Sequence, residues 1–213
     1  MKSLLVLIGL AIAGCGSYST YRTTRIAPPG KTEWIAGLQA AGAIAPGEGG
    51  APLPEIAIAA RRGLSERAEV QLNGTVLPIK QLATGSLEVA GKARLFESGR
   101  WSLAAGAAAG YRIAESGGAI IEGYQVSAPL ILGVELGRHQ LVYSVAVGYQ
   151  RYFSSGARPV GIPFLGNSLG FLWQLGKNVA LLPEAGLAKT PTENFMTETS
   201  QLFHVGIAVL WTR

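Results

Sequence analysis

A strict alternation of side-chain character constrains this chain more than any other feature of its sequence. It is clearest in residues 139–153, where one face carries only large apolar and aromatic residues: Leu141, Tyr143, Val145, Val147 and Tyr149. The other face carries mainly small and polar residues: Val142, Ser144, Ala146, Gly148 and Gln150. A period of two is that of a β-strand between two environments, and helical spacing is hardly seen in the chain. The sequence therefore predicts an all-β fold.

Segments of this kind follow one another along the chain, and their connections alternate in length. We count ten segments, at about 31–44, 53–62, 66–78, 84–96, 100–113, 121–136, 139–153, 162–175, 178–189 and 201–212. Short connections contain 63–65, 97–99, 137–138 and 176–177, and long ones contain 45–52, 79–83, 114–120, 154–161 and 190–200. Short periplasmic turns and longer outer loops are typical of outer-membrane barrels. We expect an up-and-down antiparallel transmembrane β-barrel of about ten strands, with eight or twelve as alternatives.

The composition fits this fold. The chain is 48% hydrophobic and only 15% charged, which is apolar for a soluble domain. No uncharged apolar run reaches the roughly 20 residues that a spanning helix needs. In hydrocarbon, a closed barrel is the other structure that satisfies every backbone polar group.

The amino terminus has the anatomy of an export signal over residues 1–14. Lys2 supplies the positive charge, residues 4–12 form an apolar stretch, and Ala13 and Gly14 are small residues at the expected cleavage site. The apolar stretch is too short to span a membrane. We therefore expect this signal peptide to be removed.

The four residues Ile12-Ala13-Gly14-Cys15 resemble the bacterial lipobox. The resemblance implies that the thiol of Cys15 is acylated, for instance with palmitate, and that the chain is cut just before it. In lipoproteins of this type Asp after the cysteine favours retention in the inner membrane, so Gly16 implies the outer membrane. Residues 15–30 would then be a lipidated periplasmic tether, and residues 31–213 the barrel. Acyl chains on Cys15 are the only attached groups that we expect.

Both termini should lie in the periplasm, because an even number of strands returns the chain to the side of the short turns. A lipid on Cys15 would then lie in the inner leaflet. Residues 204–211 resemble the carboxy-terminal signal that the barrel-assembly machinery reads, with a polar residue, Gly206, and alternating apolar positions that end in Trp211. Thr212 and Arg213 after the aromatic residue depart from that pattern. The expected partners are outer-membrane lipid and the lipoprotein-sorting and barrel-assembly machineries.

Three stretches, residues 24–31, 62–70 and 182–187, look like those of poorly characterised bacterial outer-membrane β-barrel lipoproteins. This resemblance covers most of the mature chain. It implies a fold and a location, and it implies no activity.

A ten-stranded barrel with strands about 4.8 Å apart and tilted by about 40° has a wall radius of about 10 Å, so side chains fill most of its lumen. The alternation predicts the following lumen-facing residues: Arg67, Glu69, Glu88, Lys92, Arg94, Arg112, Glu135, Glu184 and His204. They could line a narrow polar pore or a binding cavity. They could equally close the lumen through pairs of opposite charge, because buried charges need partners. The mixture of signs favours the closed, structural barrel.

Catalytic residues are not predicted. The chain has two His and no Asp, and it lacks the spacing of metal ligands and of phosphate-binding loops. Register could bring His204 near Glu184 and Glu184 near Ser168, which would suit acyl transfer. A lipid-modifying barrel acyl hydrolase is therefore kept as a second alternative.

Other classes of protein are disfavoured. The formal charge of +5 is modest and scattered, so we expect no binding of nucleic acid. The single cysteine excludes disulfides within the chain and cysteine-based zinc sites. A periplasmic lipocalin-like binding lipoprotein, the first alternative, would place the apolar faces inside. Aromatic residues at the ends of the apolar stretches, which suit a membrane interface, argue against it: Trp101, Tyr111, Tyr143 and Tyr149. The sequence predicts neither a ligand nor an oligomeric state.

Overall fold

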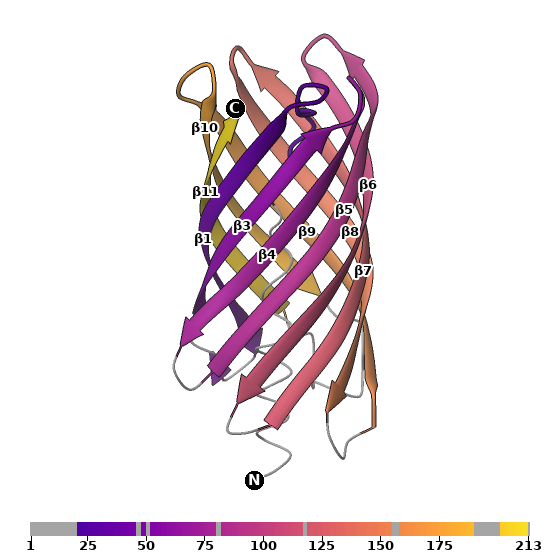
Figure 1. Cartoon of the computed structure of the whole chain (residues 1–213), viewed down its shortest axis with the longest axis vertical. Coiled ribbons are helices and arrows are strands. Elements are labelled where there is room, and N and C mark those ends of the chain that lie inside the picture. The colour runs from indigo at the N-terminus through magenta and orange to yellow at the C-terminus, as the bar shows by residue number, and fades with distance from the viewer. Residues whose placement is uncertain are drawn as a thin grey trace.

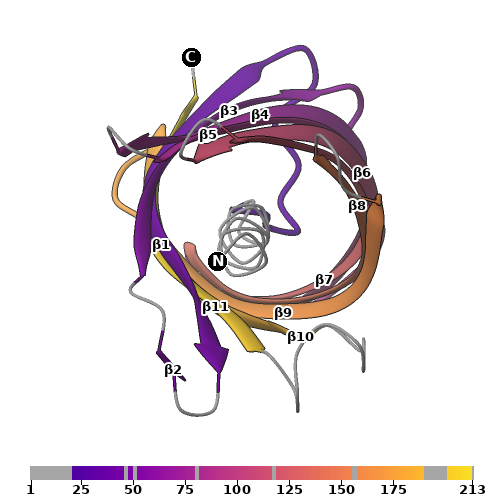
Figure 2. The same cartoon turned by 90° about the horizontal axis from the view of Figure 1, so that it is seen from below.

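The strands of this chain follow one another around a closed ring (Figures 1 and 2). The structure is a computed structural model that describes residues 21–45, 48–49, 52–79, 82–116, 119–154, 158–189 and 201–212. The strands of the ring are β1 (Thr32–Ala45), β3 (Leu53–Gly63), β4 (Ala68–Ile79), β5 (Leu82–Ser98), β6 (Trp101–Ser116), β7 (Ala119–Leu136), β8 (His139–Ser154), β9 (Val160–Gln174), β10 (Val179–Lys189) and β11 (Gln201–Thr212). The two-residue β2 (Glu48–Gly49) pairs only with the end of β1.

Each strand pairs antiparallel with the next, and β11 returns to pair with β1 along its length. The seam runs from the pair Glu33 and Thr212 to the pair Ile44 and Gln201. Closure leaves no unpaired edge in the ring, as a barrel in hydrocarbon requires. The chain is a closed ten-stranded antiparallel β-barrel, and the predicted fold class is confirmed. In the part of the chain that the structure describes, no helix is long and apolar enough to cross a membrane.

The two faces of the wall differ in the way that the alternation predicts. Along β8, Tyr143 and Val147 are 44% and 55% exposed on the outside, whereas Val142 and Gln150 are buried inside. The same pattern holds in β3, where Ile58 is exposed between buried neighbours. The outer surface is therefore apolar, whereas the interior holds charged and polar side chains beside apolar clusters, one of which contains Ile35 and Leu182.

The connections at one end of the barrel, which we call the short-turn rim, are two to four residues long. At the other end, the long-loop rim, the connections β1–β3, β8–β9 and β10–β11 are longer, whereas only two residues separate β4 from β5 and β6 from β7. The prediction of longer connections at 79–83 and 114–120 is therefore wrong, because the flanking strands pair as far as Ile79 with Leu82 and Ser116 with Ala119.

Two-residue turns join β5 to β6 and β7 to β8, and each begins with a glycine of positive φ, Gly99 (56°) and Gly137 (66°). Glycine adopts this backbone conformation without steric cost, as hairpin turns of this kind require. Thr212, at the end of β11, donates its N–H to the carbonyl oxygen of Asn178 in the β9–β10 turn. The end of β11 therefore lies at the short-turn rim.

Substituting Arg at two exterior valines should show a dependence on depth. Val147 lies midway along β8, and Val179 is the first residue of β10 at the short-turn rim. With the barrel folded in phospholipid bilayers, we expect Val147→Arg to lower the free energy of unfolding by roughly 2–4 kcal/mol and Val179→Arg by roughly 0–1 kcal/mol. Urea titrations of folding measure both values. Equal costs at the two depths would contradict a lipid-facing exterior.

Candidate functional site

The residues before β1, Tyr21 to Ala27, run inside the barrel, and we call them the N-terminal segment. Figure 2 shows the described chain turning from the rim into the ring. Tyr21, Thr23, Thr24 and Ala27 are each at most 2% exposed. The sequence analysis assigned these residues to a tether and found no signal that they lie in the lumen. The segment is the main feature of the site that sequence reasoning missed.

A tight turn at the short-turn rim connects the N-terminal segment to β1. Gly30 has a φ of 73°, and its N–H donates to the carbonyl oxygen of Gly63 at 2.9 Å. The N–H of Lys31 donates to the carbonyl oxygen of Pro28, also at 2.9 Å. A Cβ atom on Gly63 would lie only 2.1 Å from the carbonyl oxygen of Ala27. Glycine at position 63 therefore allows the segment to pack against the end of β3.

Four buried charged groups of the wall form the centre of the site. Glu69 Oε1 lies 3.0 Å from Lys92 Nζ and 3.7 Å from Arg61 Nη1. Arg61 also pairs with Glu33 at 2.6 Å. The four side chains, from β1, β3, β4 and β5, carry two formal charges of each sign when all are ionised. This balance is what allows charges to be stable away from water.

The same charged groups bind the backbone of the N-terminal segment. Lys92 Nζ donates to the carbonyl oxygens of Thr23 at 2.5 Å and Arg25 at 2.9 Å. Glu69 Oε2 accepts a hydrogen bond of 2.8 Å from the N–H of Ala27. Because the segment has no strand partner along these residues, the side chains of the wall satisfy backbone groups that would otherwise be buried without partners.

The segment contributes two arginines that neutralise acidic residues of the wall. Arg22 Nη2 lies 3.0 Å from Glu88 Oε1, and both side chains are buried. Arg25 pairs with Glu135 through two nitrogens, at 3.2 Å and 2.5 Å, close to the short-turn rim. Bonds between charged partners are among the stronger hydrogen bonds. The segment is therefore held by its side chains as well as by its backbone.

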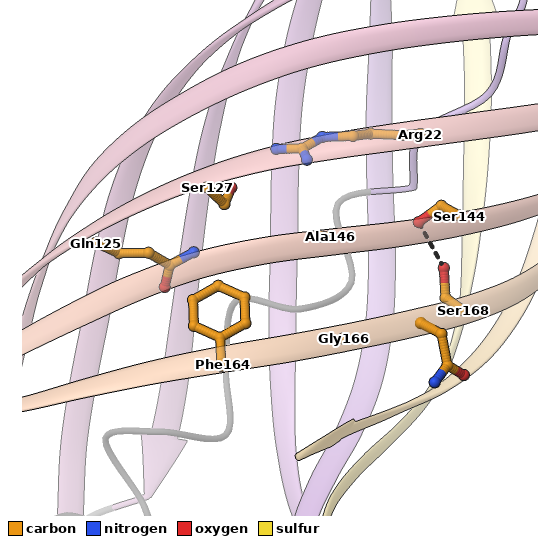
Figure 3. A pocket seen from close by; sticks show the side chains of 9 residues that line it. Arg22, Gln125, Ser127, Ser144, Ala146, Phe164, Gly166 and Ser168 are labelled. Atoms are coloured by element: carbon orange, nitrogen blue, oxygen red, sulfur yellow. Dashed lines mark hydrogen bonds between the residues drawn. The ribbon is translucent and has the colours of Figure 1, made fainter. Parts of the chain in front are cut away.

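The contacts of the segment reach most of the way around the wall. Thr24 Oγ1 lies 2.6 Å from Ser102 Oγ of β6 and accepts a hydrogen bond from Gln140 Nε2 of β8 at 2.9 Å. Two cavities beside Arg22 measure only about 20 Å³ and 10 Å³. Figure 3 shows the larger one, which Arg22, Ser144 and Ser168 line together with other residues of the wall. A cavity of this size holds about one water molecule, so the lumen is filled at this level.

The expected lumen-facing residues occupy four kinds of position. Those buried inside the barrel are Glu69, Glu88, Lys92, Arg112, Glu184 and His204. Glu135 is partly buried at the rim, where it meets Arg25. Arg94 is partly exposed near a bulge in β5 and pairs with Glu97. Arg67 differs from the expectation, because it is exposed in the turn before β4 begins at Ala68.

Arg61 and Glu33 belong to the centre of the site but were not among the expected residues. The signal for Arg61 was present in the sequence. In β3, Glu55, Ala57 and Ala59 are buried at alternate positions, and extending that period of two reaches Arg61. For Arg22 and Arg25 there was no such signal, because the N-terminal segment has no periodicity.

The three residues considered for acyl transfer are only partly brought together. His204 Nε2 lies 3.0 Å from Glu184 Oε1, and both residues are buried. Ser168 lies on β9, two strands from His204, and its hydroxyl is 3.2 Å from Ser144 Oγ. The intervening strand places Gly186 between Ser168 and His204 in register. A nucleophile must lie within hydrogen-bond reach of its base, and the described partner of Ser168 is another serine.

No protein-family model and no curated protein sequence matches this chain. Solved structures resemble it at low sequence identity. The translocator domain of autotransporter NalP from Neisseria meningitidis is 11% identical, with a TM-score of 0.49 over 99% of this chain and 94% of that one. The outer membrane protease OmpT from Escherichia coli is 9% identical, with a TM-score of 0.46 over 87% and 97%. The outer membrane protein OprG from Pseudomonas aeruginosa is 10% identical, with a TM-score of 0.37 over 87% and 97%. These similarities concern the barrel fold and carry no information on activity.

Removing the charge of Glu69 should destabilise the barrel strongly. We expect Glu69→Gln to lower the free energy of unfolding by roughly 3–5 kcal/mol, because Lys92 and Arg61 then lose a buried counter-charge. The matched control is Glu97→Gln, which removes an exposed partner of Arg94 and should change stability by less than about 1 kcal/mol. Urea unfolding in detergent micelles measures both. Equal changes in the free energy of unfolding would show that the buried cluster contributes no more to stability than a surface pair.

Proposed function

We propose that this chain is a lipidated bacterial outer-membrane β-barrel whose lumen is closed by its own N-terminal segment, and that it works as a structural barrel with no open pore. The observation that carries this proposal is that charged side chains of the wall bind the N-terminal segment. Glu69, Glu88 and Lys92, which could have lined an aqueous passage, instead bind residues of the segment.

The exterior of the barrel supports a location in a membrane. Large apolar side chains cover it, and Leu38 (62% exposed), Ile58 (57%) and Leu130 (49%) are examples from three strands. Contiguous apolar surface on this scale is rare on soluble monomers. A lipocalin-like protein would bind ligands in an open apolar lumen, whereas this interior carries many buried charged and polar side chains and is filled beside Arg22. The distribution of side chains therefore favours the membrane-spanning alternative.

The lengths of the connections support one orientation, because three of the five connections at the long-loop rim are longer than any connection at the short-turn rim. In barrels of the outer membrane the short turns lie in the periplasm and the longer loops face outward. The short-turn rim, with Thr212 at the end of β11, would then lie in the periplasm. Exposed aromatic residues on the outer face, including Trp101 next to a short turn and Tyr149 further along the wall, suit the interfaces of a bilayer.

Cys15 lies outside the described residues, so its acylation rests on the lipobox resemblance of the sequence. Two or more acyl chains anchor a protein stably, at about 0.8 kcal/mol per buried methylene. Outer-membrane lipid and the sorting and assembly machineries are the proposed partners.

Conductance tests the closed lumen. Purified wild-type barrel in planar bilayers should show no discrete conductance steps, because the segment fills the lumen. Deletion of residues 21–27 should produce such steps, since it removes Arg22 and the backbone that Lys92 binds. A milder variant, Arg22→Ala with Arg25→Ala, should give intermittent openings if the deletion fails to fold.

A slower migration after boiling on detergent gels verifies that each variant is folded. Wild-type protein that conducts as well as the deletion variant would overturn the closed-barrel proposal and favour the polar pore.

Metabolic labelling with an alkyne fatty acid tests whether Cys15 is acylated. Wild-type protein should be labelled, and Cys15→Ser should lose the label completely while remaining a heat-modifiable barrel. A variant with a secretory signal peptidase site in place of the lipobox should still resist extraction with carbonate, because the barrel itself spans the membrane. Label retained by Cys15→Ser would contradict acylation at this residue.

A further inference from the structure

We propose that the short-turn rim binds anionic phospholipid, whose phosphate groups lie among a ring of exposed cations next to a girdle of tryptophans. This inference rests on the proposed membrane location, and the orientation proposed above places the ring in the periplasmic leaflet. It goes beyond that function because it assigns a chemical class of lipid to one end of the barrel. The six side chains, which we call the basic ring, are Lys31, Arg62, Arg67, Arg100, Arg138 and Lys177.

The basic ring extends around the whole rim. Each of the four short turns carries one of its members, and the other two adjoin the start of β1 and the end of β3. All six side chains are exposed. A single macromolecule would contact one side of the barrel, whereas lipid molecules surround it. The distribution of the cations therefore fits lipid.

Cations outnumber unpaired carboxylates at this rim. Glu97 and Glu135 also lie here, but they pair with Arg94 and Arg25. Among the residues that the structure describes, Glu66 is the one other exposed carboxylate in the short turns, and none of the ion pairs includes a member of the basic ring. Clustered cations at a membrane surface attract anionic lipid. A zwitterionic lipid carries its own ammonium beside the phosphate and neutralises such a ring less well.

The long-loop rim has no comparable excess among the exposed charges that the structure describes there. These are three cations and two carboxylates: Arg151, Arg158, Lys189, Glu115 and Glu122. Both ends of the barrel meet water and headgroups, so a general need for solubility would not favour one sign at one end. The excess of cations at the short-turn rim therefore indicates a partner of negative charge.

Two members of the basic ring lie side by side on neighbouring strands. Arg62 of β3 pairs in register with Thr32 of β1. The N–H of Gly63, the next residue, donates to the carbonyl oxygen of Lys31 at 3.3 Å. Like charges on adjacent strands repel each other, so an anion between them would stabilise this arrangement. A phosphate group can accept charge-assisted hydrogen bonds from arginine and from lysine.

Two further members lie in neighbouring two-residue turns whose geometry does not require arginine. Arg100 and Arg138 each follow a glycine of positive φ, Gly99 and Gly137. The second position of such a turn accepts many residues. The N–H of Glu135 donates to the carbonyl oxygen of Arg100 at 2.7 Å, which brings the two turns together on the rim. The two arginines provide a second place for a phosphate group.

The tryptophans are the second, independent observation. All four tryptophans of the chain lie at the short-turn ends of their strands. Trp34, Trp101 and Trp173 are 41%, 52% and 49% exposed on the outer face, and Trp211 pairs with Trp34 across the seam. Indole rings are enriched where hydrocarbon meets headgroups. These four residues, the tryptophan girdle, therefore mark the membrane interface at this rim.

The basic ring lies at the depth where phosphate groups are expected. Trp34 is two residues further along β1 than Thr32, which pairs with Arg62. Two residues of a strand tilted by about 40° rise by about 5 Å. Arg100 is the residue directly before Trp101. Long cationic side chains just outside the tryptophan girdle can reach the phosphate groups of the leaflet.

Quenching of tryptophan fluorescence by brominated lipid tests the proposal. The full chain is reconstituted in vesicles of phosphatidylcholine and phosphatidylglycerol in equal amounts, with bromine on the acyl chains of one lipid or of the other. Bromine quenches an indole on contact, and the tryptophan girdle contains every tryptophan, so the signal reports lipid at the short-turn rim. Both leaflets contain both lipids, so the direction of insertion does not matter. We expect phosphatidylglycerol to bind there about fivefold more strongly than phosphatidylcholine.

Removing cations from the basic ring should lower this preference by about twofold or more. The test variant carries three substitutions: Arg62→Gln, Arg100→Gln and Arg138→Gln. The matched control removes three cations from the long-loop rim and should keep the preference: Arg151→Gln, Arg158→Gln and Lys189→Gln. Salt at about 1 M should weaken the preference of the wild-type protein, because it shortens the screening length to about 3 Å. Heat-modifiable migration on detergent gels verifies that each variant is folded.

The outcomes separate this inference from the proposed function. Equal quenching by the two brominated lipids would overturn the binding of anionic lipid and leave the barrel in the membrane, and an acidic polymer or protein would become the candidate partner. A preference that the test variant keeps, or that the control variant loses, would also overturn it. If neither brominated lipid quenches the tryptophans, the outer face does not contact lipid, and the membrane location fails together with the inference.

Discussion

The hydrogen bonds between β11 and β1 are the constraint on which the rest of this structure depends. They turn a meander of ten antiparallel strands into a ring without edges, and the ring divides each strand into an outer and an inner face. Because the outer face is apolar, the polar side chains of the chain are concentrated in the lumen. The lumen inside a wall about 10 Å in radius cannot hydrate many charges, so each of them requires a partner nearby.

The N-terminal segment provides many of those partners. Glu88 and Glu135 receive arginines from the segment, and Lys92 receives carbonyl oxygens. The wall in turn satisfies the backbone of a segment that has no neighbouring strand. Neither part is complete alone, because the segment would be buried with unpaired backbone groups and the wall would retain unpaired charges. This mutual dependence favours a permanent closure over a removable plug.

The sequence predicted the wall far better than the contents of the lumen. A period of two is a direct consequence of strand geometry, so β8 and its faces could be predicted from residues 139–153 alone. The pairing of Glu184 with His204 also followed from register. Arg22 and Arg25 could not be placed, because a short polar stretch before a strand has no periodicity, and its position depends on partners from many strands. Arg67 was expected to face the lumen because the strand was predicted to begin at residue 66. The strand β4 begins two residues later, at Ala68, so Arg67 lies in the turn before it.

The location of residues 21–27 also bears on the order in which the barrel can assemble. The segment directly precedes β1, yet it is enclosed by a seam that forms only when the last strand arrives. Thr212 and Glu33 meet across this seam although almost the whole chain separates them, and contacts so distant in sequence tend to form late. Tyr21 packs against both Gly37 of β1 and Gly206 of β11, so the recess that holds its ring exists only after the first and last strands have met. The final position of the segment is therefore set late in assembly, together with the closing of the seam.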